Sequence, residues 1–170
     1  RSIFVVCIQN IAKKICMFSK KVVPLRKILS LMAKILIIDD ERAIRNTLKE
    51  ILEFEGYHVE VAENGRVGLE RALEGAYDLI FTDIKMPEMD GLEFLHSYRK
   101  GIIQHGEEAP IVVITGHGSV DSAVDALKGG AFDFIQKPLD LNRLLVTTKH
   151  ALDHKSLVQE TKVLRKKVGK

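Results

Sequence analysis

The chain has no tryptophan and only two cysteines, Cys7 and Cys16, both near its start. Residues 32–170 hold no cysteine, which excludes a disulfide framework or a cysteine metal site in that part of the chain. A domain of this size without cysteine is typical of a reducing compartment. We therefore expect a cytoplasmic protein.

Acidic residues are missing from residues 1–31, which hold seven Lys and Arg. Residues 32–154 hold 13 Lys and Arg against 22 Asp and Glu, and residues 155–170 hold six basic residues against Glu160. The pI near 8.8 thus averages an acidic domain with two basic ends. We expect no direct binding to nucleic acid, because the basic end lacks aromatic residues and a reading helix.

Long hydrophobic runs are also missing. The apolar stretch Ile3–Ile8 ends at Gln9 and Asn10, well short of a signal-peptide core or a membrane span. An acid-free amphipathic segment can touch anionic lipid. We interpret residues 1–31 as an extension that the fold does not need, and expect no membrane partner and a domain that begins at Met32.

Five short apolar or alternating stretches predict β-strands, and each is followed by a helical pattern. The expected strands are Ile35–Ile38, Tyr57–Ala62, Leu79–Thr82, Ile111–Ile114 and Phe132–Ile135. The expected helices are Glu41–Glu55, Asn64 to about Leu73, Leu92–Arg99, Ser119 to about Lys128, and Leu141 onward. Asn64, Ser119 and Asp140 are expected to cap the starts of their helices, and Gly101 is expected to lie in a polar loop. Strands that alternate with helices in this way predict a doubly wound α/β domain with a parallel sheet.

The last helix is expected to extend past the domain, because no Pro or Gly occurs between Leu141 and Lys167. About 27 helical residues would span roughly 40 Å. An a/d-like seam follows the domain, at Leu157, Thr161, Leu164 and Val168. The seam is too short to predict a coiled coil by itself, so a solvated linker helix stays the alternative.

Polar residues stand where four of the predicted strands end: Asp39 and Asp40, then Asp83, Thr115 and Lys137. In open α/β sheets, ligands bind beyond the carboxyl ends of the strands. Three carboxylates there repel one another unless they share a cation, and oxygen ligands indicate Mg²⁺. Asp83 is then the best-placed nucleophile for a phosphoryl group, with Lys137 and Thr115 as partners of the phosphoryl oxygens.

These residues match a family. The chain resembles the receiver domain of bacterial two-component response regulators over about Lys34 to Asp153. The matching motifs are Ile37-Ile38-Asp39-Asp40-Glu41, Asp83-Ile84-Lys85-Met86-Pro87 with Gly91, Thr115-Gly116, and Lys137-Pro138.

The resemblance implies a flavodoxin-like fold in which a sensor histidine kinase phosphorylates Asp83. It implies that Asp39, Asp40, Asp83 and the backbone carbonyl of Lys85 hold magnesium, and that Lys137-Pro138 is a cis peptide. It also makes Thr115 and Lys137 the signalling pair and Phe134 the aromatic switch. Since Phe134 lacks the tyrosine hydroxyl, any switching by this residue has to depend on packing.

A narrower resemblance is to receivers of sigma-54-dependent enhancer-binding activators of the NtrC type. It is carried by Thr115-Gly116-His117-Gly118-Ser119-Val120, by Gly129-Gly130-Ala131-Phe132-Asp133-Phe134 and by the long final helix. Such receivers continue into ATPase and DNA-binding domains, and this chain has no Walker motif. We interpret residues 32–153 as a receiver domain, residues 154–170 as a linker helix, and the chain as a fragment; the alternative is a stand-alone regulator.

The leading interpretation is a signalling switch that is not an enzyme. Phosphorylation would change the surface formed by Val120–Lys128, Phe132–Ile135 and the helix from Leu141, and would promote a homodimer. The enzyme alternative is a small aspartyl-phosphate phosphatase, which Lys85 disfavours because it stands where such enzymes place a general acid. A flavin-binding module is a third alternative, disfavoured because three converging carboxylates would repel the flavin phosphate.

Overall fold

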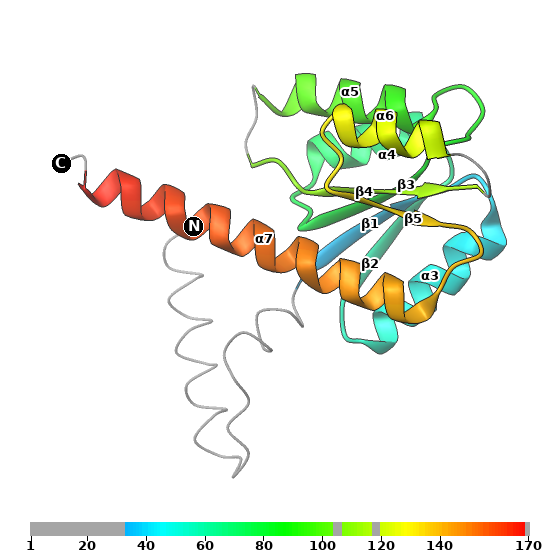
Figure 1. Cartoon of the computed structure of the whole chain (residues 1–170), viewed down its shortest axis with the longest axis horizontal. Coiled ribbons are helices and arrows are strands. Elements are labelled where there is room, and N and C mark those ends of the chain that lie inside the picture. The colour runs from blue at the N-terminus through cyan, green and yellow to red at the C-terminus, as the bar shows by residue number, and fades with distance from the viewer. Residues whose placement is uncertain (1–32, 104–106, 117–119, 169–170) are drawn as a thin grey trace, which may run out of the picture.

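Five parallel strands form one sheet in the spatial order β2-β1-β3-β4-β5 (Figure 1). The structure is a computed structural model that describes residues 33–103, 107–116 and 120–168. The strands are β1 (Lys34–Ile38), β2 (His58–Ala62), β3 (Leu79–Asp83), β4 (Ile111–Thr115) and β5 (Asp133–Gln136). This order is that of the flavodoxin-like doubly wound fold, so the predicted fold class is confirmed.

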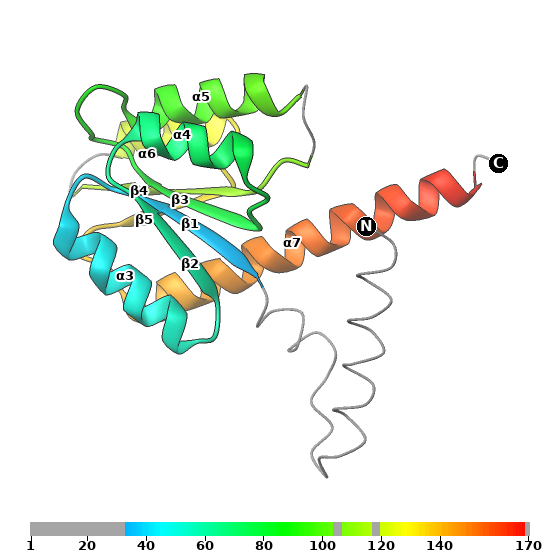
Figure 2. The same ribbon diagram turned by 180° about the vertical axis from the view of Figure 1, so that it is seen from behind.

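Helices cover both faces of the sheet. The described helices are α3 (Arg42–Phe54), α4 (Gly65–Glu74), α5 (Gly91–Ile102), α6 (Val120–Lys128) and α7 (Leu141–Val168). Figures 1 and 2 show α4, α5 and α6 on one face of the sheet and α3 and α7 on the other. Because the central strands β1, β3 and β4 are buried on both sides, their sequences are nearly continuous apolar runs rather than alternating ones.

The sheet separates two layers of core. Toward α4, α5 and α6, the layer includes Leu36, Ile38, Ile80, Val113, Phe94, Leu95 and Tyr98. Toward α3 and α7, it includes Ile35, Ile37, Phe81, Val112, Leu48, Leu52 and Leu144. The central strands β1, β3 and β4 contribute to both layers, and this holds their carboxyl ends in fixed positions.

Two predicted helix caps are confirmed. The Asn64 side chain accepts a hydrogen bond from the Val67 backbone N–H at 2.9 Å, and Asp140 Oδ1 accepts one from the Arg143 backbone N–H at 2.7 Å. Each cap satisfies an N–H group that has no partner inside its own helix. The predicted cap at Ser119 and the extension 1–31 lie outside the described residues.

Helix α5 is longer than predicted, because it continues through Gly101 to Ile102 instead of ending near Arg99. Gly101 was predicted to lie in a loop, and glycine is ordinarily unfavourable inside a helix. Here Ile102 is buried. A Cβ atom on Gly101 would lie 2.8 Å from Leu73 Cδ2 of α4, so glycine permits the close approach of these two helices.

Helix α7 has a packed half and a projecting half (Figure 1). Leu144, Thr148 and Ala151 are fully buried against the sheet, whereas Leu157 and Leu164 are more than half exposed. The side chain of Val168, the last position of the predicted seam, lies outside the described residues. Among the described helices, none combines the length and the apolar character needed to cross a bilayer.

Candidate functional site

The strand register brings the predicted site residues to one edge of the sheet. Asp39 directly follows β1, Asp83 ends β3 opposite Ile114, and Thr115 ends β4 opposite Gln136. Lys137 follows β5, and its backbone N–H donates to the Thr115 carbonyl at 2.7 Å. The convergence predicted from the strand ends is therefore present in the structure.

Three carboxylates meet at this edge. Asp39, Asp40 and Asp83 each offer an oxygen atom, and these atoms all lie within 4.8 Å of one another. Asp39 and Asp83 are buried and Asp40 is exposed. The set therefore combines two fixed oxygen donors with one that faces solvent.

The two oxygens of the Asp39 carboxylate differ in their hydrogen bonding. Its Oδ1 accepts a hydrogen bond from the Glu41 backbone N–H at 2.8 Å. Its Oδ2 is buried and accepts no hydrogen bond from any described residue. The nearest cation to Oδ2 among these residues is the Lys137 ammonium, at 3.5 Å, which makes no hydrogen bond to it. A buried acceptor without a hydrogen bond is unfavourable, and a hard cation bound by oxygen ligands would relieve it. These residues thus fit the magnesium site that the sequence predicts.

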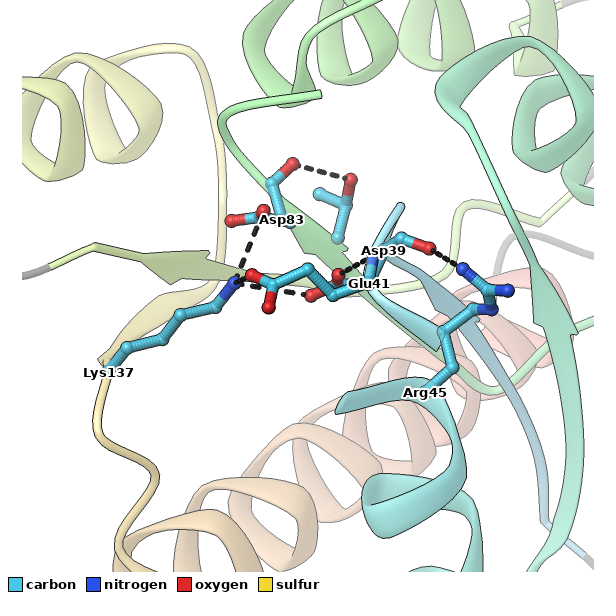
Figure 3. A network of polar contacts seen from close by, with 6 residues as sticks. Asp39, Glu41, Arg45, Asp83 and Lys137 are labelled. Carbon is cyan, nitrogen blue, oxygen red and sulfur yellow. Dashed lines mark hydrogen bonds and ion pairs between the residues drawn. The ribbon is translucent and has the colours of Figure 1, made fainter. Parts of the chain in front are cut away.

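The Lys137 ammonium group lies among the carboxylates (Figure 3). Its Nζ is 3.3 Å from Asp83 Oδ2, 3.2 Å from Glu41 Oε1 and 3.5 Å from Asp39 Oδ2. Burial lowers the pKa of Lys137, but the negative charges of Asp39 and Asp83 and the hydrogen bonds to Glu41 and Asp83 outweigh it and raise this pKa overall. Lys137 is therefore positively charged at neutral pH. The peptide bond that follows it, Lys137-Pro138, is cis as predicted.

Burial raises the pKa values of the two inner carboxyl groups. The pKa of Asp39 rises to about 6, because burial outweighs the hydrogen bond from the Glu41 backbone and the charge of Lys137. Burial raises the pKa of Asp83 as well, against the charge of Lys137, and the neighbouring charge of Asp40 adds to the increase. The ionised site is thus unfavourable without a cation.

Without metal, the contribution of Asp39 to the free energy of unfolding should decrease as pH rises from about 4 to about 6. In that range the folded protein holds a proton on Asp39 that the unfolded chain has released, so rising pH favours unfolding. Asp39→Asn should flatten this slope and stabilise the metal-free protein at pH 7 by about 1–2 kcal/mol. Urea unfolding in EDTA at several pH values measures this slope in the parent, in Asp39→Asn and in the control Asp153→Asn, which removes an exposed acid. Equal slopes in the three proteins would contradict the prediction.

The predicted switch residues lie beside the site. Thr115 is buried at the end of β4, and Phe134 stands on β5 opposite Val113. Phe134 is half-buried and packs against the core layer below α4, α5 and α6. Lys85 follows two residues after Asp83 with an exposed side chain. The ligand role of its backbone carbonyl stays a prediction.

Two contacts of the site were not predicted from the sequence. Glu41 belongs to the quoted Asp39-Asp40-Glu41 motif, yet we assigned it no role, and it is an ion-pair partner of Lys137. Arg45, one turn along α3, donates from Nη1 to the Asp39 carbonyl at 2.6 Å. The position of Glu41 directly after the two aspartates was the signal available, whereas nothing in the sequence singles out Arg45.

Gly91 is required by the close packing below Asp83. Its backbone N–H donates to the Ile84 carbonyl at 2.8 Å. A Cβ atom at this position would lie 2.3 Å from the Asp83 carbonyl oxygen. Any larger residue would therefore push the loop after β3 away from the site.

Comparison with known families gives a match over residues 35–149, to the response regulator receiver domain. The chain belongs to this family. As a receiver domain it is part of a signalling family, and the fold, the strand-end carboxylates and the lysine after β5 are consistent with a phosphoacceptor role.

Relatives of this receiver domain are transcriptional regulators. The transcriptional regulatory protein ZraR of Klebsiella oxytoca is 42% identical over 123 residues, which cover 72% of this chain and 27% of ZraR. The nitrogen assimilation regulatory protein NtrX of Azorhizobium caulinodans is 40% identical over 133 residues, which cover 77% of this chain and 28% of NtrX. The chain thus spans little more than a quarter of these relatives. Both are sigma-54 activators of the NtrC type, which confirms the narrower resemblance.

Solved structures agree with this assignment. A response regulator receiver domain protein from Clostridium thermocellum matches with a TM-score of 0.68 and 36% identity, over 75% of this chain and 99% of that chain. NtrX from Brucella abortus matches with a TM-score of 0.72 and 37% identity, over 78% of this chain and 30% of that chain. Both matches cover most of the described residues.

Proposed function

We propose that this receiver domain accepts a phosphoryl group on Asp83 from a sensor histidine kinase, in a magnesium-dependent reaction. The observation that carries the proposal is the arrangement around Asp83. Its buried carboxylate lies 3.3 Å from the Lys137 ammonium group and beside an Asp39 oxygen that accepts no hydrogen bond from the described part of the chain. A nucleophile, a cation for the phosphoryl oxygens and a set of metal ligands thus share one edge of the sheet.

In the proposed reaction, an Asp83 carboxylate oxygen attacks the phosphorus atom of a phosphohistidine. A P–O bond to Asp83 forms and the P–N bond of the donor breaks, and the departing imidazole keeps that electron pair and takes up a proton from solvent. Lys137 pairs with one phosphoryl oxygen and the Thr115 hydroxyl donates a hydrogen bond to another. Magnesium, held by Asp39, Asp40, Asp83 and the Lys85 carbonyl, would neutralise charge that builds up on the phosphoryl oxygens.

Incubation with acetyl phosphate and Mg²⁺ tests this function. Intact-mass measurement should show one added phosphoryl group per chain, and EDTA should prevent the addition. The same reaction separates the receiver from a small aspartyl-phosphate phosphatase. A receiver should accumulate the phosphorylated form, whereas sustained release of phosphate over many turnovers without a labelled form would favour the phosphatase.

We further propose that phosphorylation changes the face formed by α6, β5 and α7. Thr115 would move toward the phosphorylated Asp83, and the space it leaves would admit the Phe134 ring, a shift of population between two packings. The exposed apolar residues Val120, Val124 and Leu127 of α6 support a contact surface on this face. The exposed Leu157 and Leu164 of α7 extend it along the projecting helix.

The resulting homodimer should depend on both the phosphoryl group and the projecting helix. A chain treated with beryllium fluoride, a phosphoryl mimic, should sediment as a dimer. A version that ends at Asp153 should associate at least roughly ten-fold more weakly, because it lacks the exposed leucines of α7. Four samples, each chain with and without the mimic, separate the two contributions. A monomer in all four at high protein concentration would exclude the dimer.

The domain boundaries follow from the same proposal. Residues 32–153 would form the receiver domain and residues 154–170 a helical linker toward ATPase and DNA-binding output domains. The support is that α7 projects from the sheet beyond its packed half, and that the regulators ZraR and NtrX are several times longer than the matched region. Residues 1–31 would lie outside the fold.

A further inference from the structure

The side chain of Glu41 stands where a helix cap is expected and does not act as one. Glu41 is the N-cap residue of α3, yet its side chain accepts no hydrogen bond from the first turn of the helix. Its carboxylate instead extends to Lys137, 96 positions away in the sequence, at 3.2 Å (Figure 3). Because a capping side chain typically stabilises a helix, the orientation of Glu41 calls for another role.

The Lys137 ammonium group is surrounded by carboxylates. An ammonium group has three N–H donors. Here Nζ donates to Glu41 at 3.2 Å and to Asp83 at 3.3 Å, and lies 3.5 Å from Asp39. A phosphoryl group on Asp83 therefore competes with these carboxylates for the positive charge of Lys137.

Glu41 is the partner that can leave. Asp39 is fully buried and held by the Glu41 backbone N–H, and Asp83 carries the incoming group. The side chain of Glu41 is 59% exposed, whereas that of Lys137 is 20% exposed and that of Asp83 is 6% exposed. Glu41 is thus the most solvent-exposed of the three carboxylates around the ammonium group, and the one that can turn toward solvent.

We propose that Glu41 is a positioning residue that restrains the site, because its ion pair with Lys137 competes with the phosphoryl group and slows phosphorylation of Asp83. The inference rests on the proposed function and adds a property of this chain to it. Release of Glu41 from Lys137 becomes part of each phosphorylation event. The restraint is modest, since one partner of the ion pair is exposed to solvent.

The test compares initial rates of phosphorylation by acetyl phosphate over a range of donor concentrations, at saturating Mg²⁺ and low salt. Glu41→Gln should raise the rate at low donor concentration by roughly two- to five-fold. The gain should shrink in high salt, which screens the ion pair in the parent chain. Glu50→Gln is the matched control, because Glu50 is exposed on the same helix and its substitution removes the same charge. Its rate should equal that of the parent.

Two further measurements separate the ion pair from other effects. Glu41→Asp keeps the charge but draws the carboxylate back from Lys137 by one methylene, so its rate should lie between those of the parent and Glu41→Gln. A parental rate in Glu41→Asp would show that charge alone matters and would overturn the ion-pair claim. The Mg²⁺ affinity of Glu41→Gln should equal that of the parent; a large loss would make Glu41 a metal ligand instead.

The outcomes also distinguish this inference from the proposed function. If the parent chain takes up no phosphoryl group, the proposed function is wrong and the role of Glu41 falls with it. If the parent is phosphorylated and Glu41→Gln reacts at the same rate as Glu50→Gln, the role of Glu41 alone is wrong.

Discussion

The Asp83→Asn variant should take up no phosphoryl group from acetyl phosphate and Mg²⁺, whereas the parent chain becomes phosphorylated. Asparagine has nearly the same shape as aspartate, so the buried position at the end of β3 stays filled. Its amide, however, is neutral and cannot act as the nucleophile that attacks phosphorus. Intact-mass measurement under non-denaturing conditions should show labelling at background level.

The variant should also stay folded, which makes the result interpretable. Burial raises the pKa of Asp83, so removal of its charge should leave the metal-free protein as stable as the parent or more stable at neutral pH. Asp125→Asn is the control, because Asp125 is an exposed acid on α6. It should be labelled as fully as the parent. Labelling of Asp83→Asn to the parental level would place the nucleophile elsewhere.

Replacement of Asp40 should cause the largest loss of magnesium affinity. Asp40 is the exposed member of the three carboxylates, and its side chain accepts no hydrogen bond from the described residues, so both its oxygens are free to bind a cation. Asp39 has one oxygen occupied by the Glu41 backbone, and we expect it to act partly through water. Asp40→Ala should weaken Mg²⁺ binding at least roughly ten-fold, and phosphorylation should fall with it.

Calorimetric titration with Mg²⁺ measures this effect directly. Asp153→Ala is the matched control, because it removes an exposed acid from α7, far along the chain from the site. Its affinity should equal that of the parent. An unchanged affinity in Asp40→Ala would move the metal site away from this edge of the sheet.

The sequence was sufficient to predict most of the fold because the informative signals are local. Four apolar runs, each ending in a polar residue, predicted a parallel sheet whose carboxyl ends carry Asp39, Asp83, Thr115 and Lys137. Asn64 and Asp140 marked helix starts, since a capping side chain bonds to a backbone N–H only three residues away. Such signals require no knowledge of the tertiary structure.

Features that depend on packing could not be predicted from the sequence. The sequence placed Gly101 in a loop, and only the close approach of Leu73 explains why the helix continues through it. Asp39 and Asp40 are adjacent and chemically identical, yet one is buried and the other exposed, because consecutive side chains at a strand end point in different directions. The contact of Glu41 with Lys137 joins residues 96 positions apart and depends on side-chain conformation.

The most direct test of the phosphoacceptor assignment is to identify the modified residue chemically. Borohydride reduces an aspartyl phosphate to homoserine, so the phosphorylated chain can be reduced, digested and sequenced by mass spectrometry. We predict homoserine at position 83 alone, and none when Mg²⁺ is removed before phosphorylation. Homoserine at position 39 or 40, or phosphate on any other residue with position 83 unmodified, would contradict the assignment of Asp83 as the phosphoacceptor.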